Sequence, residues 1–134
     1  MPAALVVCAA LLAAGPAAAG AGAGAAAANA SASLGRCNAY SGKQLHNCVA
    51  DVLDTLSNNL RGGENMAKAK RSLSTAASQL RAAGSKAQAL SAIGQCRSVI
   101  AAILERVRTP QQISAYSAIT RVLSRAAALI QSKG

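Results

Sequence analysis

Residues 64–83 read ENMAKAKRSLSTAASQLRAA, and their spacing predicts one amphipathic helix. Met66, Leu73 and Leu80 recur every seven residues, and three alanines recur with the same period between them. Large side chains therefore alternate with very small ones along one seam, as in helices that pack against partner helices. Because alanine lets a neighbouring backbone come close, this stretch predicts tight packing of several helices.

Capping signals place three further helices around this stretch. Each signal is a hydroxyl residue followed three positions later by glutamine, a pair that satisfies the first N–H groups of a helix. The pairs are Ser41/Gln44, Ser85/Gln88 and Thr109/Gln112. Glycines at 62–63 and 84 stand where a left-handed residue commonly ends a helix. Together these signals predict helices over residues 41–61, 64–83, 85–108 and 110–132.

The apolar stripes of the four helices are wide enough to share one core. The sequence contains no Trp and no Phe, so this core must be built from Leu, Ile, Val and Ala. Short connections make consecutive helices antiparallel. We expect an all-α fold, an up-down-up-down four-helix bundle over residues 37–134. His46 is expected to be a solvated residue at the edge of its helix.

The N-terminal residues differ in kind from the rest of the chain. An apolar run at residues 3–14 has the length of a signal-peptide core and is too short to span a membrane. Small residues after Pro16 form a cleavage pattern, which predicts a signal peptide over residues 1–19. The alternative is a retained low-complexity arm, because no Lys or Arg precedes the apolar run. A signal peptide implies a secreted or periplasmic protein.

The segment between the signal peptide and the bundle is rich in Ala, Gly and Ser. Such residues bury little apolar surface, so residues 20–36 are expected to form a flexible linker. Asn29-Ala30-Ser31 within it matches a glycosylation sequon, which matters only in a eukaryotic secretory route.

Three cysteines remain once the signal peptide is removed. In an oxidising compartment at least one pair should close. Cys48 and Cys96 fall on helices that are diagonal in the expected bundle, beyond the ~7 Å Cα separation that a disulfide allows. Cys37 precedes the helix that carries Cys48, on a lead-in that can fold back along that helix, so among the three possible pairings we favour a Cys37–Cys48 disulfide. Cys96 is left as a free thiol, either a small buried residue or a reactive or intermolecular one.

The sequence shows no recognisable catalytic or cofactor motif. No nucleophile elbow, haem-attachment motif, di-iron motif or glycine-rich phosphate loop occurs. His46 and Cys48 point to different sides of a helix, which argues against a metal site. We expect a protein that is not an enzyme and binds neither cofactor nor metal.

Positive charge is the strongest functional signal. The chain has 14 Lys and Arg against 4 Asp and Glu. Cations and hydroxyl residues share the polar faces of helices 64–83 and 110–132. The candidate partner contacts are Arg71, Arg81, Arg121 and Arg125. Such faces suit an anionic polysaccharide, a lipid head group or an acidic protein surface, or they serve only solubility. Nucleic acid is not expected, because no aromatic side chains are placed to stack on bases.

These observations favour a small exported protein that acts as a non-catalytic binding module. The main alternative is a membrane-active cationic protein of toxin or defence type. The layout of Cys37, Cys48 and Cys96 around a helical bundle also resembles the plant invertase and pectin-methylesterase inhibitors, which implies a secreted, inhibitor-like bundle. The Cys37 to Cys48 spacing differs from theirs, no fourth mature cysteine follows, and the chain is shorter, so no site residue is carried over.

Overall fold

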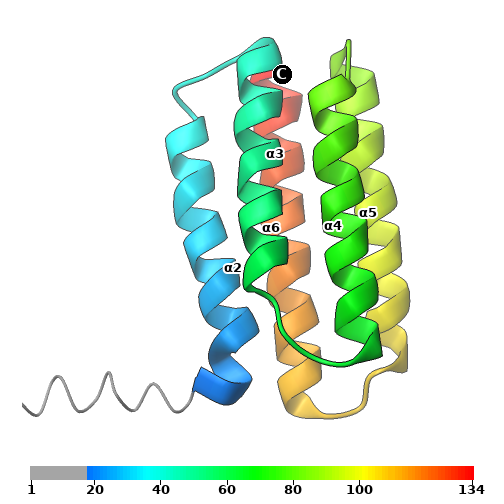
Figure 1. Ribbon diagram of the computed structural model, residues 1–134. Helices are drawn as coiled ribbons and strands as arrows, with labels where there is room; N and C mark the ends of the chain where they lie inside the picture. The colour runs from blue at the N-terminus through cyan, green and yellow to red at the C-terminus, as the bar shows by residue number, and fades with distance from the viewer. Residues whose placement is uncertain (1–17) are drawn as a thin grey trace, which may run out of the picture.

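The computed structural model describes residues 18–134, which form five α-helices and no strand (Figure 1). The helices are α2 (Ala18–Cys37), α3 (Gly42–Asn59), α4 (Glu64–Ala82), α5 (Lys86–Arg106) and α6 (Pro110–Lys133). The all-α prediction is confirmed. The structure has five helices in residues 18–134, whereas four were predicted. The predicted signal peptide, residues 1–19, lies outside the described residues except for its last two.

Successive helices run in opposite directions, and each packs against the next (Figure 1). The first of them, α2, also packs against the last, α6, so the five helices close a ring. A four-helix bundle would place α3 directly beside α6. Here α2 takes up most of that contact, and α3 and α6 touch only weakly.

The flexible linker expected over residues 20–36 is wrong, because these residues belong to helix α2. The prediction counted Ala and Gly as unable to bury enough surface, but alanine has the highest helix propensity of all residues. One face of α2 is buried against the bundle; it consists of Ala26, Ala27, Ala30, Leu34 and Cys37. Small side chains let this helix lie close to α3 and α6, and Leu34 anchors it with no exposed surface.

Two of the three predicted N-caps are formed. Ser85 Oγ accepts a hydrogen bond from the Gln88 N–H at 3.2 Å, and Thr109 Oγ1 accepts one from the Gln112 N–H at 3.3 Å. Ser41 makes no side-chain cap, so that prediction is wrong. Helix α3 begins instead at Gly42, whose φ of +56° favours glycine.

The glycine stops are also placed differently from the prediction. Helices α3 and α4 end before their glycines, at Asn59 and Ala82, and the C-cap residues that follow, Leu60 and Ala83, are both extended. Gly62 is required for another reason: a Cβ there would lie 2.9 Å from Met66 Cβ. The α3–α4 turn therefore folds tightly over the start of α4.

The core is aliphatic throughout. The predicted seam residues Met66, Leu73 and Leu80 of α4 are all buried, as are the alanines between them. The largest fully buried side chains come from all five helices: Leu34, Leu45, Leu53, Leu56, Leu60, Leu73, Leu80, Ile93, Ile100, Ile119, Leu123 and Ile130.

Among the described helices, α5 alone is long and apolar enough to cross a membrane, with a mean hydropathy of 1.3 over its best window. In the bundle it packs between α4 and α6. A core helix of a soluble protein can have the same length and apolar composition.

Candidate functional site

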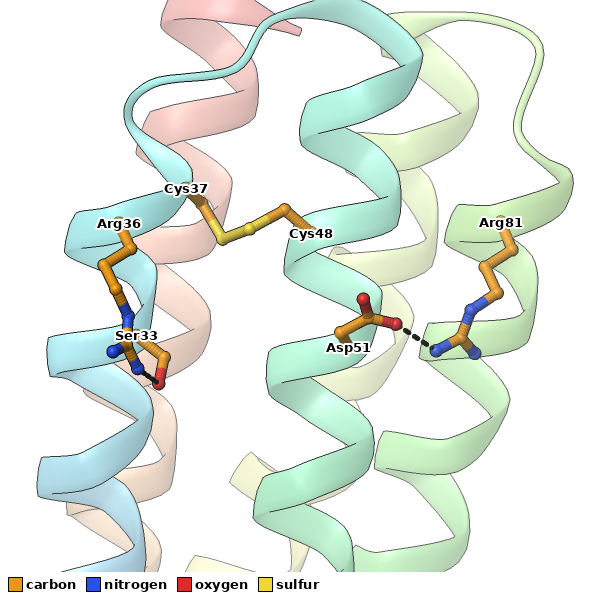
Figure 2. The surroundings of a disulfide bond; sticks show 6 residues. All are labelled: Ser33, Arg36, Cys37, Cys48, Asp51 and Arg81. Carbon is orange, nitrogen blue, oxygen red and sulfur yellow. Dashed lines mark hydrogen bonds and ion pairs between the residues drawn. A yellow bond between two sulfur atoms is a disulfide. The ribbon is translucent and has the colours of Figure 1, made fainter.

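Cys37 and Cys48 form a disulfide that joins the end of α2 to α3 (Figure 2). The S–S distance is 2.05 Å and the Cα atoms are 5.7 Å apart. The predicted pairing is therefore present. Cys96 is the free cysteine of residues 18–134, and it is buried on α5. Burial raises the pKa of its thiol, and a hydrogen bond with Ser72 partly offsets that increase.

Three lysines at one end of the bundle are engaged by the fold itself. Lys43 Nζ donates to the carbonyls of Arg81 and Ala83 at the end of α4, the latter at 3.0 Å. Lys86 Nζ donates to the Gln131 carbonyl in the last turn of α6 at 2.9 Å. Lys133 Nζ donates to the Asn38 carbonyl, just after α2. Each lysine thus satisfies carbonyl groups that a helix end leaves without partners.

Arg81, a candidate partner contact, forms ion pairs with two carboxylates of α3, and Figure 2 shows the one with Asp51. Its guanidinium is 2.8 Å from Asp51 Oδ1 and 2.7 Å from Asp54 Oδ2. Hydrogen bonds to Asp51 and then Asp54 raise the pKa of Arg81. One positive charge faces two negative ones here, so this part of α4 offers no excess positive charge to an anion.

Arg71, by contrast, lines a groove between α4 and α5 with a volume of about 420 Å³. Lys68 stands beside it, one helical turn earlier, and neither side chain forms an ion pair within residues 18–134. The floor is formed by small residues, Ala76, Ala92 and Cys96. Of the predicted seam alanines of α4, only Ala76 lines this groove, and it is itself buried.

Apart from the exposed apolar side chain of Val99, the remaining walls of this α4/α5 groove are polar and uncharged. They carry hydroxyl groups and side-chain amides, from Ser72, Thr75, Gln79 and Gln95. No Asp or Glu is among the lining residues. The groove therefore combines two cations at one end with neutral hydrogen-bonding groups along its length.

Arg121 and Arg125 are both exposed on α6, four residues apart and thus on one face. The structure does not bring them to the α4/α5 groove, because α6 packs against α5 and α2. Arg97 of α5 lines a smaller hollow between α5 and α6, together with Thr120. The four predicted arginines therefore lie in three different environments. Arg71 lines the α4/α5 groove, Arg81 is in ion pairs with α3, and the other two are on the exposed face of α6.

Lys68 and Arg97 were not among the predicted partner contacts. Lys68 lies three residues before Arg71, which places both on the same side of a helix. This spacing could have predicted that Lys68 shares the surroundings of Arg71. Nothing in the sequence indicates the hollow beside Arg97, because it depends on the packing of α5 against α6.

His46 is buried, and the expected solvated position is wrong. The residue is 3% exposed, and neither ring nitrogen has a hydrogen-bond partner among the described residues. Burial, and then the nearby charge of Lys43, lowers the pKa of His46. A Cβ on Gly134 would lie 3.1 Å from its Nε2, so the end of α6 covers the ring. Residues 18–134 contain no group of three or more His, Cys, Asp or Glu that could hold a metal.

Comparisons with protein-family models, with curated proteins and with solved structures find no match to this chain. Functional inference therefore rests on the geometry and charge of the residues described above.

Proposed function

We propose that this protein is an exported, non-catalytic binding module whose α4/α5 groove holds an anionic partner. The observation that carries the proposal is the pair Lys68 and Arg71, which share a groove that no carboxylate lines and which form no ion pair within residues 18–134. Ion pairing removes Arg81 from this set. An anion in the groove would meet two cations whose charge is not already balanced.

The uncharged walls of the groove suggest which anionic partner fits best. Hydroxyl and amide groups along Ser72, Thr75, Gln79 and Gln95 can donate to and accept from sugar hydroxyls. Lys68 and Arg71 can pair with the carboxylates of acidic sugars. We therefore favour an acidic polysaccharide over a lipid head group or an acidic protein surface.

Export is the second part of the proposal. It is supported by the apolar run and the cleavage pattern at the N-terminus. The Cys37–Cys48 disulfide is typical of proteins that reach an oxidising compartment. Sequencing the N-terminus of the protein recovered outside the cytoplasm tests this part, and a first residue of Gly20 is the expected result.

Binding of a galacturonic-acid oligomer, measured by titration calorimetry, tests the groove. The neutral galactose oligomer is the control ligand and should bind at least 10-fold more weakly, because charge-assisted hydrogen bonds are the stronger ones. Replacing Lys68 and Arg71 with Gln should weaken binding of the acidic oligomer at least 10-fold. Arg36→Gln removes one charge from the exposed end of α2 and should change the affinity less than 2-fold. If Arg36→Gln weakened binding of the acidic oligomer as much as the replacement of Lys68 and Arg71 does, the proposal would be contradicted.

The membrane-active alternative makes a different prediction for anionic vesicles. In the closed bundle most large apolar side chains face inward, with Val99 and Ile113 as exposed exceptions on the helices, and disruption of a bilayer would require the buried ones to be exposed. We expect phosphatidylglycerol vesicles to retain a trapped dye when the protein is added. Dye release at submicromolar protein, without binding of the acidic oligomer, would favour the membrane-active function instead.

A further inference from the structure

A second cavity lies at the opposite end of the bundle from the three engaged lysines, where the α3–α4 turn meets the starts of α2 and α6 (Figure 1). Its volume is about 420 Å³, within the range of small-molecule sites. The α4/α5 groove shares no residue with it. The lining residues come from three helices, α2, α4 and α6, and from the α3–α4 turn: Gly22, Ala23, Arg61, Gly62, Gly63, Met66, Gln111, Gln112, Ala115 and Tyr116.

Tyr116 supplies a buried polar group to this cavity. The residue is 2% exposed and lines the cavity. Its main-chain carbonyl accepts a hydrogen bond from Thr120 Oγ1 at 3.0 Å. Burial raises the pKa of Tyr116, so the hydroxyl keeps its proton at neutral pH and is available as a donor.

The charge of the cavity is positive. Arg61 is the charged residue among those that line it; Glu64, the first residue of α4, directly follows the lining residue Gly63 but does not itself line the cavity. Gly63, the N-cap of α4, also lines the cavity and provides no side-chain cap. The first N–H groups of α4 therefore lack a side-chain acceptor, and they favour a negative group nearby.

One wall of the cavity is apolar. Ala23 of α2, Met66 of α4 and Ala115 of α6 contribute it. Met66 and Ala115 are each 8% exposed, so their accessible surface is small and turned toward this space. The cavity thus offers a cation and a hydroxyl donor together with a hydrocarbon surface.

We propose that this cavity binds an amphipathic organic anion of the medium-chain carboxylate type, with the carboxylate held by Arg61 and the Tyr116 hydroxyl. The hydrocarbon chain lies on Ala23, Met66 and Ala115. The glutamine amides at 111 and 112 complete the rim. This ligand is separate from the anionic partner proposed for the α4/α5 groove, because the two sites lie in different parts of the bundle.

Decanoate is the probe, and titration calorimetry of the full-length protein is the measurement. We expect one decanoate per chain and at least 10-fold weaker binding of 1-decanol, which has the same chain length and no charge. Arg61→Gln should weaken decanoate binding about 10-fold, because it removes the charged partner. Tyr116→Phe keeps the ring and removes only the hydroxyl, and it should weaken binding 3-fold or more.

Arg108→Gln is the matched control, since Arg108 lies in the α5–α6 connection at the same end but does not line the cavity. It should leave the affinity within 2-fold of the unchanged protein, and so should Arg71→Gln in the other groove. Thermal unfolding of each variant verifies that it is folded. Equal weakening by Arg61→Gln and Arg108→Gln, equal binding of decanoate and decanol, or several decanoates per chain would overturn the proposal.

Discussion

Lys43 on the first turn of α3 donates a hydrogen bond to the carbonyl of Ala83, which lies 40 residues later at the end of α4. The contact links a helix start to the end of the next helix. It is one of three lysine contacts of this kind at the same end of the bundle. Part of the positive charge of the chain therefore stabilises the fold, and only the remainder is available for binding.

Loss of the disulfide should lower the stability of the bundle. The bond closes a loop over a sequence separation of 11 residues, for which chain-entropy reasoning gives about 3 kcal/mol. A variant with Cys37→Ser and Cys48→Ser should therefore unfold at a lower urea concentration. The unchanged protein under reducing conditions should match it. An unfolding midpoint identical in all three samples would show that the bond contributes nothing.

Helix α2 should contribute to stability through Leu34, which is fully buried. Leu34→Ala leaves a cavity in the core, and such changes cost about 2 to 5 kcal/mol. Ala32→Ser, at an exposed position of the same helix, should change the free energy of unfolding by less than about 0.5 kcal/mol. Urea unfolding followed by circular dichroism measures both. If residues 20–36 were a flexible linker, neither substitution would have an effect.

The stability of the protein should fall as the pH is lowered below about 6.5, the ordinary pKa of histidine. Burial lowers the pKa of His46 in the folded protein, so at acidic pH the unfolded chain binds this proton more readily than the folded one. The free energy of unfolding then decreases with falling pH, by at most about 1.4 kcal/mol per pH unit. Thermal unfolding between pH 8 and pH 5 measures this dependence.

His46→Gln provides the control for that measurement, because it keeps a polar side chain that does not titrate. Its stability should vary little between pH 8 and pH 5. A wild-type protein equally stable at both ends of this range, or a variant with the same pH dependence, would assign the effect to another group.

Arg81→Gln should destabilise the protein by about 1 kcal/mol or less, since exposed ion pairs contribute little. The change leaves Asp51 and Asp54 close together without their shared cation. Their repulsion is screened by salt, so the difference from the unchanged protein should shrink between 0.05 M and 1 M NaCl. Arg36→Gln, whose side chain contacts only Ser33, should show no such salt dependence. A salt-independent difference would mean that packing of the arginine stem matters more than its charge.

The helices of residues 41–134 could be predicted from local signals because heptad spacing and capping pairs act within one helix. The ends of α4, α5 and α6 lie within two residues of the predicted ones. Helix α2 could not be predicted in this way. Its stability depends on a surface between α3 and α6 that exists only in the folded bundle, and its composition of Ala, Gly and Ser is equally typical of a linker.

The candidate site was predictable only in part. The pairing of Cys37 with Cys48 followed from the topology and from the geometric limits of a disulfide. Arg71 and Arg81 were both predicted as partner contacts, but the ion pairs of Arg81 could not be foreseen, because Asp54 and Asp51 lie 27 and 30 residues earlier on a different helix. The burial of His46 depends on the end of α6. Contacts between distant parts of the chain decide these cases, and single-helix patterns do not contain them.

The closed ring of helices also constrains how the molecule assembles as it is made. Helix α6 is the last of the five to leave the ribosome, yet it forms one side of the place where the first, α2, is seated. Until α6 is complete, α2 has only α3 to pack against and half of its buried face stays open to water. If the protein crosses a membrane during its synthesis, the bundle therefore cannot close until the last turns of α6 have left the translocation channel. Until then the chain stays incompletely folded, as passage through the channel requires.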